Sequence, residues 1–428
     1  MLSISEPRRV AILGGSRIPF ARSNTAYAQA SNQDMLTAAL QALVDRFGLA
    51  GARLGEVAAG AVLKQARDIN LTREAVLSTS LSPETPAYDL QQACGTGLEA
   101  AILVANKIAL GQIDVGIAGG ADTTSDPPIA VNEGFRQALL AANRAKTTGA
   151  RLKALVKVRP GMLFKPELPR NAEPRTGLSM GEHCELMAKR WGISRADQDA
   201  LAVRSHHNMA AAYDRGDFDN LIVPWRGLAR DNNLRSDSSI DKLARLKPVF
   251  DREQGTLTAG NSTPLTDGAA VVLLASEEWA QARGLPILAY LRAGEAAAVD
   301  FVSGAEGLLM APAYAVPRML DKLGIRLQDF DFYELHEAFA AQVLCTLAAW
   351  EDPEFARERL GRDTPPGSID RVKLNVNGSS LAAGHPFAAT GGRILANLAQ
   401  MIDKNGGGRG LISICAAGGQ GVVAVVEK

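Results

Sequence analysis

Gln91-Gln92-Ala93-Cys94-Gly95-Thr96-Gly97-Leu98-Glu99-Ala100-Ala101 places a cysteine between a strand-like run and a helix-like run. Apolar residues repeat at helical spacing from Leu98, and no proline follows until Pro127, which predicts a buried helix that begins near Gly95. A thiol at a helix start faces unpaired N–H groups and the positive end of the helix dipole, and both favour the thiolate. Cys94 is therefore a candidate nucleophile. The alternative is a buried cysteine that serves as a small apolar side chain, the commoner role for an arbitrary cysteine.

The composition is that of an ordinary globular protein and argues against nucleic acid as the main partner. The 428 residues are 46% hydrophobic and 21% charged, and 46 basic side chains balance 46 acidic ones. The four cysteines show neither paired nor CxxC spacing, so we expect no disulfide framework and no metal site. The opening MLSISEPRRV lacks the apolar run of a signal peptide, and no stretch is long and apolar enough to span a bilayer. We therefore expect a cytoplasmic protein.

Short apolar runs alternate with helix-like segments along most of the chain. Strands are predicted at residues 9–13, 57–62, 87–90 and 114–119, and again from residue 269. This alternation predicts an α/β protein whose strands are buried on both faces. Residues 131–249 break the pattern and are interpreted as an insertion. Residues 1–130, completed by about 250–280, would form one half of the main body, and residues 281–428 the other.

The first part of this insertion, residues 131–170, has a strong excess of positive charge. A basic, partly amphipathic segment in a neutral protein is typical of contact with a membrane surface, an acidic cofactor or a partner. A solvated helical face is the alternative. The segment contains the acidic residues Glu133 and Glu167 against the basic residues Arg136, Arg144, Lys146, Arg151, Lys153, Lys157, Arg159, Lys165 and Arg170.

The main body carries a weak internal repeat. Cys94, the pair Thr96-Gly97, a helix and the strand IDVGIAGG correspond to His385, the pair Thr390-Gly391, a helix and the strand LISICAAGG. Two copies of one α/β unit, packed together, would bring both helix starts to a shared centre.

Three further reactive side chains lie at boundaries between predicted elements. His336 lies at a strand-to-helix corner, His385 in a glycine-rich loop before a helix, and Cys415 at the end of the strand LISIC. Such boundaries are where α/β enzymes carry their chemistry. Together with Cys94, these residues are the candidate catalytic set.

Five sequence blocks, in order along the chain, resemble the signature motifs of the thiolase family: QQACGTGLEA (91–100), TAGNSTPLTDGAA (258–270), HEAF (336–339), GHPFAATGGR (384–393) and CAAGGQG (415–421). HEAF, where many biosynthetic thiolases have asparagine, resembles the 3-ketoacyl-CoA thiolases of β-oxidation, most closely the thiolase subunits of bacterial and mitochondrial trifunctional complexes. The resemblance implies an α/β thiolase fold. Its two similar halves form a five-layer α-β-α-β-α sandwich, with an inserted loop domain over the CoA tunnel.

The resemblance also implies catalytic roles. His385 would take the proton of Cys94, whose sulfur attacks the 3-keto carbon of a 3-ketoacyl-CoA. Cys415 would protonate the acetyl-CoA enolate that leaves, and His336 with His385, through water, would stabilise the enolate oxygen. CoA is the co-substrate, and no permanently bound cofactor or metal is implied.

Further residues are implied to hold the substrate, and further partners to bind the chain. Backbone N–H groups of Cys94, Ala417 and Gly418 would hold the tetrahedral oxyanion. A homodimer or dimer of dimers and a complex with a hydratase/dehydrogenase subunit are implied. For Thr263, the alternative to a substrate-binding role is that of a residue that only forms a turn. The substrate-binding residues implied are Thr263 near the pantetheine, Arg235 near the adenine nucleotide, Met180 in the tunnel wall, and Phe339.

Three other functions stay open at this point. A biosynthetic acetoacetyl-CoA thiolase would use the same residues in the reverse direction. A 3-ketoacyl synthase shares the fold and a Cys/His/His triad, but its decarboxylating condensation has no use for a thiol base at Cys415. The third alternative is a scaffold subunit without catalytic turnover. The presence of all four reactive side chains argues against it.

Overall fold

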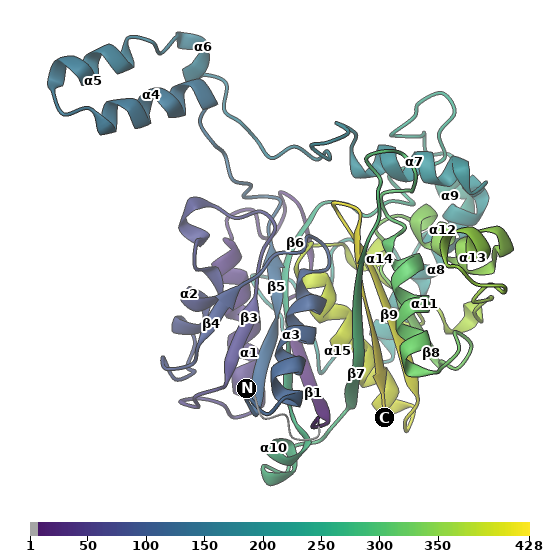
Figure 1. Ribbon diagram of the computed structural model, residues 1–428. Helices are drawn as coiled ribbons and strands as arrows, with labels where there is room; N and C mark the ends of the chain where they lie inside the picture. The colour runs from purple at the N-terminus through teal and green to yellow at the C-terminus, as the bar shows by residue number, and fades with distance from the viewer. Residues whose placement is uncertain (1–6) are drawn as a thin grey trace.

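The computed structural model describes residues 7–428, and its strands form one hydrogen-bonded path (Figure 1). The order along the path is β4-β3-β5-β6-β1-β7-β10-β9-β8, and β2 pairs with β6 beside it. Residues 1–6, on which part of the N-terminal expectation rests, lie outside the described residues. The strands are β1 (Val10–Arg17), β2 (Ala21–Arg22), β3 (Glu56–Ala59), β4 (Ala87–Asp89), β5 (Val115–Asp122), β6 (Thr266–Ser276), β7 (Ala289–Ala298), β8 (Phe332–Leu335), β9 (Arg409–Ala416) and β10 (Gln420–Glu427).

Helices separate most of the strands, as the alternating pattern predicts. Within residues 7–428, no helix combines the length and the apolar character that crossing a membrane requires. In chain order the α-helices are α1 (Asn32–Arg46), α2 (Leu71–Leu77), α3 (Thr96–Ala109), α4 (Glu133–Arg144), α5 (Thr148–Leu155), α6 (Pro160–Leu163), α7 (Met180–Arg190), α8 (Arg195–Asp214), α9 (Ile240–Ala244), α10 (Glu277–Ala282), α11 (Ala311–Leu323), α12 (Ala340–Glu351), α13 (Pro353–Arg359), α14 (Ser380–Ala383) and α15 (Ala389–Lys404).

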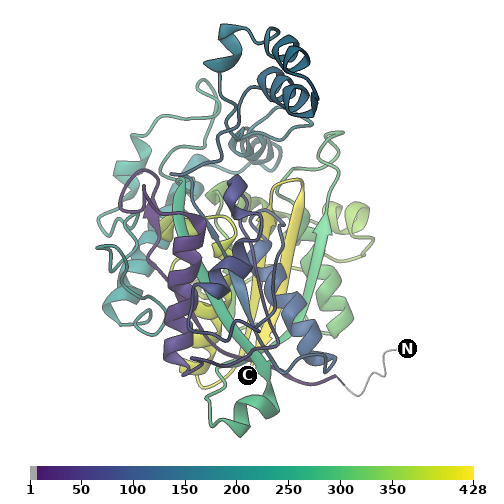
Figure 2. The same cartoon turned by 90° about the vertical axis from the view of Figure 1, so that its left-hand side faces the viewer.

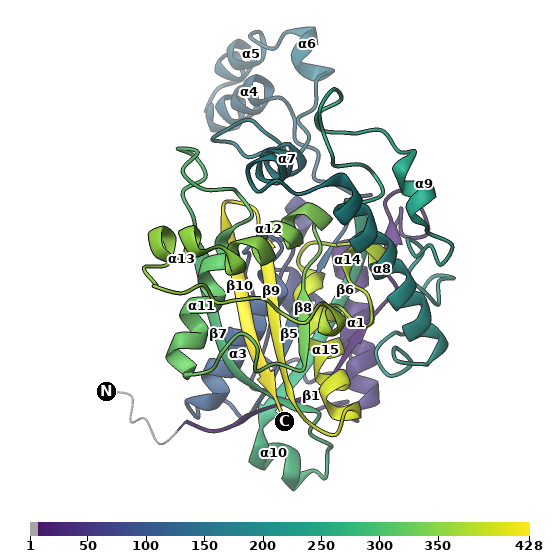
Figure 3. The same cartoon turned by 90° about the vertical axis from the view of Figure 1, so that its right-hand side faces the viewer.

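The elements stack in five layers, which confirms the predicted sandwich (Figures 1 and 3). Helices α1 and α2 cover one sheet, made of β4, β3, β5, β6 and β1. Helices α3 and α15 form the middle layer between this sheet and the second, made of β7, β10, β9 and β8. Helix α11 covers the outer face of the second sheet. Because β1 pairs with both β6 and β7, the two sheets are joined at one edge.

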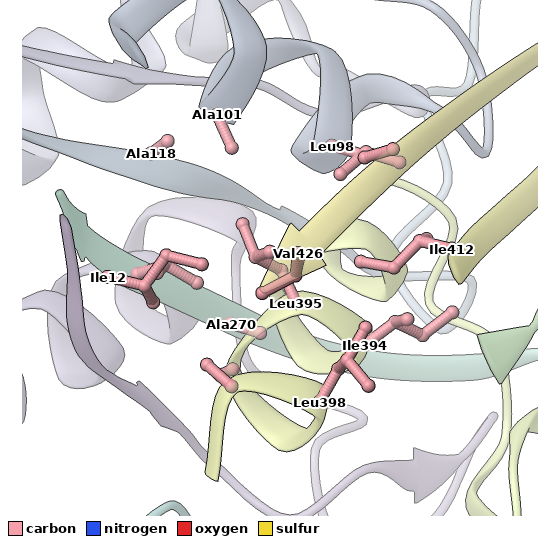
Figure 4. Close-up of a cluster of buried hydrophobic side chains, with 14 of the residues drawn as sticks. Ile12, Leu98, Ala101, Ala118, Ala270, Ile394, Leu395, Leu398, Ile412 and Val426 are labelled. Atoms are coloured by element: carbon pink, nitrogen blue, oxygen red, sulfur yellow. The ribbon is translucent and has the colours of Figure 1, made fainter. Parts of the chain in front are cut away.

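Apolar side chains from both sheets hold the middle layer in place (Figure 4). Leu98 of α3 and Leu395 of α15 lie in one cluster with Ile12 of β1, Ile412 of β9 and Val426 of β10. Every residue of β5 and β6 is buried, because other elements cover both faces of these strands. Removal of this apolar surface from water is the main force that holds the layers together.

The two central helices begin almost in backbone contact. A Cβ added to Gly391 of α15 would lie 2.1 Å from the backbone nitrogen of Leu98, and one added to Gly97 of α3 would lie 2.5 Å from the carbonyl oxygen of Ala388. A larger residue at either position would force the helices apart. The predicted meeting of the two helix starts is therefore confirmed, and it brings the loops that precede both helices together.

The helices between β5 and β6 form two parts that differ in packing. Helices α4, α5 and α6 belong to an arm, residues 129–170, that stands away from the body (Figures 1 and 2). The later part lies on the body, since Cys184 and Met187 of α7 and Leu201 of α8 are buried in one cluster with α12 residues. The division into two halves and a loop domain that covers a CoA tunnel stays a prediction.

A buried ion pair ties the later part of the insertion to β1. Asp231 accepts from both terminal nitrogens of Arg17, at 2.6 and 2.7 Å, from the N–H of Phe20 at 2.7 Å and from the hydroxyl of Tyr213 at 2.9 Å. Burial alone would lower the pKa of Arg17, but the charge and hydrogen bonds of Asp231 outweigh burial and raise it. The pair anchors the loop that also contains Arg235.

Candidate active site

Cys94 lies in a tight turn between β4 and α3. Ala93 has a φ of 47°, in the left-handed region that is unfavourable for a residue with a side chain. The Thr96 hydroxyl closes the turn, because it accepts from the N–H of Gln92 at 2.9 Å and donates to the carbonyl of Ala93 at 2.7 Å. The strained turn holds the sulfur next to the start of α3, where the sequence predicts it.

Cys94 and His385 form a direct hydrogen bond, with Sγ 3.0 Å from Nε2. The other ring nitrogen of His385, Nδ1, lies 2.6 Å from the hydroxyl of Thr390. The backbone N–H of His385 donates to the hydroxyl of Thr266 at 2.8 Å. Helix α15 and strand β6 therefore orient the imidazole toward the sulfur.

Burial keeps this pair neutral in the resting protein. Burial raises the pKa of Cys94 to about 12, although the N–H groups of Ala417 and of Cys94 itself oppose the shift. Burial, assisted by the positive charge of Arg393, lowers the pKa of His385 to about 3. The backbone N–H groups favour the thiolate, as expected, but desolvation outweighs them and the pKa rises overall. The proton must leave the sulfur during attack.

His336 lies beside this pair and is fully buried. Its ring centre is 4.1 Å from that of His385, and its Nδ1 is 2.8 Å from the hydroxyl oxygen of Ser380. Its Nε2 has no hydrogen-bond partner among residues 7–428. Burial, His385 and Arg393 together hold the pKa of His336 well below its usual range, so the ring is neutral.

The ligand atoms of Cys94, His336 and His385 all lie within 4.8 Å of one another. One thiolate and two imidazoles are ligands that Zn²⁺ accepts, so these side chains could hold such an ion with an open coordination position. The spacing of cysteines along the chain does not reveal this cluster, because its three members come from three distant segments.

Cys415 lies near the end of β9 and is buried. Burial, and then the neighbouring Cys94, raise the pKa of its thiol. The N–H of Ala417, in the turn that follows, lowers the pKa of Cys94 against the effect of burial. The N–H of Gly418 is already engaged, because it donates to Oε1 of Glu173 at 2.8 Å. The oxyanion role of the N–H groups of Cys94, Ala417 and Gly418 stays a prediction.

A cleft of 330 Å³ lies between the insertion and the body. Three cationic side chains line it, those of Arg22, Arg235 and Lys242, with Asp237 as the acidic residue among them. The predicted nucleotide-binding residue Arg235 therefore faces a cavity whose charge suits phosphate groups.

The other predicted substrate residues lie in nearby segments. Thr263 is flanked by two residues that line the cleft, and its hydroxyl donates to the carbonyl of Ala338 at 3.0 Å. Phe339 is buried and meets Phe250 edge-on, with ring centres 5.9 Å apart. Met180 begins α7 and packs against the apolar cluster around α12. Contact of these residues with substrate stays a prediction.

Three polar residues that the sequence analysis did not assign support the site. Asp122, at the end of β5, accepts from the N–H of Ala388 at 2.9 Å and so anchors the start of α15. Ser380 and Arg393 form a hydrogen-bonded chain that reaches His336. Arg393 is the last residue of the block GHPFAATGGR, so the motif could have identified it as a site residue. Asp122 and Ser380 differ from other residues only in being polar and close to glycine-containing turns.

Comparison with known proteins points to one family along the whole chain. The family described as "Thiolase, N-terminal domain" matches residues 10–278, and "Thiolase, C-terminal domain" matches residues 285–428. Proteins named 3-ketoacyl-CoA thiolase from Yersinia pestis (strain Pestoides F) and Yersinia pseudotuberculosis (serotype O:1b, strain IP 31758) are each 42% identical to this chain over 425 residues. Each match covers 98% of this chain and 97% of the relative.

Two solved structures share the fold over almost the full length. The acetyl-CoA acetyltransferase of Bacillus anthracis has a TM-score of 0.82 at 30% identity, and human mitochondrial 3-ketoacyl-CoA thiolase has 0.82 at 26% identity. Each match covers 99% of this chain and 100% of the other. The two family matches span all five motif blocks, and the site they enclose joins residues from both matched regions. The chain therefore belongs to the thiolase family.

Proposed function

We propose that this protein is an acyltransferase that cleaves 3-ketoacyl-CoA with CoA, giving acetyl-CoA and a shortened acyl-CoA, in fatty-acid β-oxidation. The observation that carries the proposal is the 3.0 Å contact between Cys94 Sγ and His385 Nε2. A cysteine paired with a neutral histidine is an arrangement that forms covalent acyl intermediates. The relatives named 3-ketoacyl-CoA thiolase support the choice of substrate.

The first half-reaction transfers the acyl group to the enzyme. His385 takes the proton of Cys94 as the sulfur attacks the 3-keto carbon. The N–H groups of Cys94 and Ala417 donate to the oxyanion that forms. The C2–C3 bond then breaks, so that the acyl group stays on Cys94 and acetyl-CoA leaves as its enolate.

The enolate is the second charge that the site must stabilise. His336 and His385 donate to its oxygen, and the Cys415 thiol gives a proton to its carbon. The thiol of the incoming CoA returns a proton to Cys415, and its sulfur attacks the thioester on Cys94. His385 finally reprotonates Cys94. The same residues serve the reverse reaction, because an enzyme lowers one barrier for both directions.

CoA acts as a co-substrate, and its nucleotide occupies the 330 Å³ cleft. Arg235, with Arg22 and Lys242, supplies positive charge for its phosphates. Thr263 contacts the pantetheine, and Met180 and Phe339 form part of the acyl tunnel. Residues 131–249 act as the loop domain over this tunnel, with residues 1–130 and 281–428 as the two halves beneath.

A thiolysis assay with 3-ketoacyl-CoAs of increasing chain length tests the function. We expect CoA-dependent cleavage of acetoacetyl-CoA and a higher kcat/KM for longer substrates, because the block HEAF resembles the 3-ketoacyl-CoA thiolases of β-oxidation and the relatives are named 3-ketoacyl-CoA thiolase. A preference for acetoacetyl-CoA alone would contradict the β-oxidation role and favour the biosynthetic alternative. Condensation of malonyl thioesters without thiolysis would favour a synthase.

We also propose that the arm, residues 129–170, binds an anionic membrane surface and acts beside a hydratase/dehydrogenase subunit. Large apolar side chains are exposed on it, such as Leu152 at 65%, Val156 at 79% and Phe164 at 81%. Helix α5 buries none of its residues. Apolar side chains beside cationic ones are typical of segments that lie at a lipid headgroup layer. We further propose that the enzyme works in the cytoplasm, as a homodimer or a dimer of dimers.

Vesicle sedimentation tests the arm. Replacing Val156 and Phe164 together by serine is expected to weaken binding to phosphatidylglycerol vesicles by on the order of 100-fold or more, since each large apolar side chain contributes about 1.5–3 kcal/mol on burial and about 1.4 kcal/mol corresponds to a tenfold change. Val372→Ser is the matched control, because Val372 is 82% exposed on the body and not on the arm. Equal loss in the control, or wild-type binding to a hydratase/dehydrogenase subunit but not to vesicles, would contradict the membrane role.

A further inference from the structure

We propose that Ser380, oriented by Arg393, holds His336 in the tautomer that carries its proton on Nε2, and so makes His336 a hydrogen-bond donor to the enolate oxygen. Both residues are positioning residues, since they act through His336 and not on the substrate. The catalytic meaning rests on the proposed function. The tautomer itself is a property of the free protein.

The contacts of Ser380 allow one arrangement in which the oxygen and the hydrogen of its hydroxyl group both have a partner. Arg393 can only donate, and its Nη2 lies 3.0 Å from the hydroxyl oxygen of Ser380, so that oxygen accepts from the guanidinium. The same oxygen lies 2.8 Å from Nδ1 of His336. The hydroxyl hydrogen is then free to point at Nδ1. A neutral imidazole that accepts at Nδ1 carries its proton on Nε2.

Nε2 of His336 has no partner among residues 7–428 in either tautomer, but the opposite tautomer would also leave the hydroxyl hydrogen of Ser380 without one. With a proton on Nδ1, the hydroxyl oxygen of Ser380 would accept from both neighbours, and its own hydrogen would lack an acceptor. Ser380 and His336 are both 0% exposed, and an unpaired donor in such a place is strongly unfavourable. Nε2 of His336 would then present a lone pair, which repels an enolate oxygen.

Arg393 is itself held within the fold as a cation. It lies in the second turn of α15 and is 4% exposed. Burial lowers its pKa to about 10, while the carboxyl groups of Glu334 and Glu337 oppose that shift. Its charge in turn disfavours protonation of His336, which keeps the ring in a neutral form where a tautomer choice exists.

Histidine-selective ¹⁵N NMR of the full chain reads the tautomer directly. The chain has five histidines, and the His336→Gln variant identifies the signals of His336. We expect a protonated Nε2 and an unprotonated Nδ1 in the wild type, and a mixture of tautomers in Ser380→Ala.

Ser379→Ala is the matched control for this experiment. It removes the adjacent hydroxyl, which also accepts from Arg393 Nη2, at 3.2 Å, but which makes no hydrogen bond to His336. The His336 signals should therefore stay as in the wild type. A proton on Nδ1 in the wild type, or an unchanged spectrum in Ser380→Ala, would overturn the proposal.

Kinetics of the two half-reactions give an independent readout. The enolate forms when the acyl group moves to Cys94 and is absent when CoA removes it. Ser380→Ala should therefore slow single-turnover acylation by 3-ketoacyl-CoA by on the order of 10- to 100-fold, while acyl transfer from preformed acyl-Cys94 to CoA stays within about twofold. The overall kcat should change more than KM, and Ser380→Thr, which keeps the hydroxyl, should restore most of the loss.

Equal slowing of both half-reactions in Ser380→Ala would indicate a general structural defect and overturn the positioning role. Failure of the proposed function looks different. If the wild-type protein shows no thiolysis, the proposed function is wrong and no half-reaction rates can be compared. The NMR signals of His336 would still decide between the two tautomers.

Discussion

Thiolysis of 3-ketoacyl-CoA is expected to fall by about 10⁴-fold or more in the Cys94→Ala variant, because the covalent acyl-enzyme step disappears with the sulfur. His385 Nε2 loses its 3.0 Å partner at the same time, so the base has no proton to take. The measurement is the initial rate of CoA-dependent cleavage of acetoacetyl-CoA and of a longer substrate.

Cys345→Ala is the matched control, because Cys345 is another buried free thiol, on α12 and outside the site. Its activity should stay within about twofold of the wild type. Mass spectrometry after incubation with 3-ketoacyl-CoA, without added CoA, should find the acyl group on the Cys94 peptide in the control and in the wild type. Retained turnover in Cys94→Ala, or acyl transfer to Cys415, would contradict the proposed mechanism.

Asp231→Asn is expected to lower the free energy of unfolding by about 3–5 kcal/mol, because it leaves a buried guanidinium without its counter-ion. The side chains of Arg17 and Asp231 are 4% and 0% exposed, and their hydrogen-bonded atoms lie 2.6 Å apart. The asparagine has nearly the same shape, so the loss reports the charge and not the packing. Urea denaturation, followed by fluorescence and circular dichroism, measures the change.

Asp34→Asn provides the comparison for this stability experiment. Asp34 pairs with Arg226 at 3.4 Å, and both side chains are more than a third exposed, at 47% and 39%. Asp34 also accepts from the N–H of Ser31 at 3.1 Å at the start of α1, a bond that the amide oxygen of asparagine can keep. Exposed pairs contribute little, so the change should stay below about 1 kcal/mol. A similar decrease in the free energy of unfolding in both variants would show that the Arg17–Asp231 pair stabilises the fold no more than an exposed ion pair does. We also expect a raised KM for CoA in Asp231→Asn, since the same loop contains Arg235.

Local patterns were sufficient for the α/β class and for the candidate residues Cys94, His336, His385 and Cys415, whereas the five-layer sandwich was implied by the resemblance to the thiolase family. Helical spacing after Cys94 and the glycines at 97 and 391 predicted two helix starts that meet, and the structure brings them into backbone contact. Motif order along the chain predicted the family, which the comparisons confirm. The helix starts depend on periodicity and on residue size, which can be read from neighbours in the chain, whereas the family was predicted from the resemblance of five motif blocks.

The state of the site was not predictable in the same way. The helix start was expected to favour the thiolate of Cys94, but burial has the larger effect and raises its pKa to about 12. Gly418 is predicted to donate to an oxyanion, and nothing in the sequence indicates that its N–H donates to Glu173, from the insertion, in the free protein. Neither effect is visible in a local pattern, because desolvation depends on everything packed around a group and a hydrogen bond depends on which distant segment arrives beside it.

The sequence by itself therefore determined the family, the layered fold and the identity of the reactive residues around Cys94. Only the tertiary structure decided the protonation of that cysteine, the partner of each N–H group and the chain from Arg393 through Ser380 to His336. Cys94 and His385 lie 291 positions apart and yet share a hydrogen bond. Contacts at such separation arise when whole layers pack, and the burial that packing creates sets which groups hold a charge and which a proton.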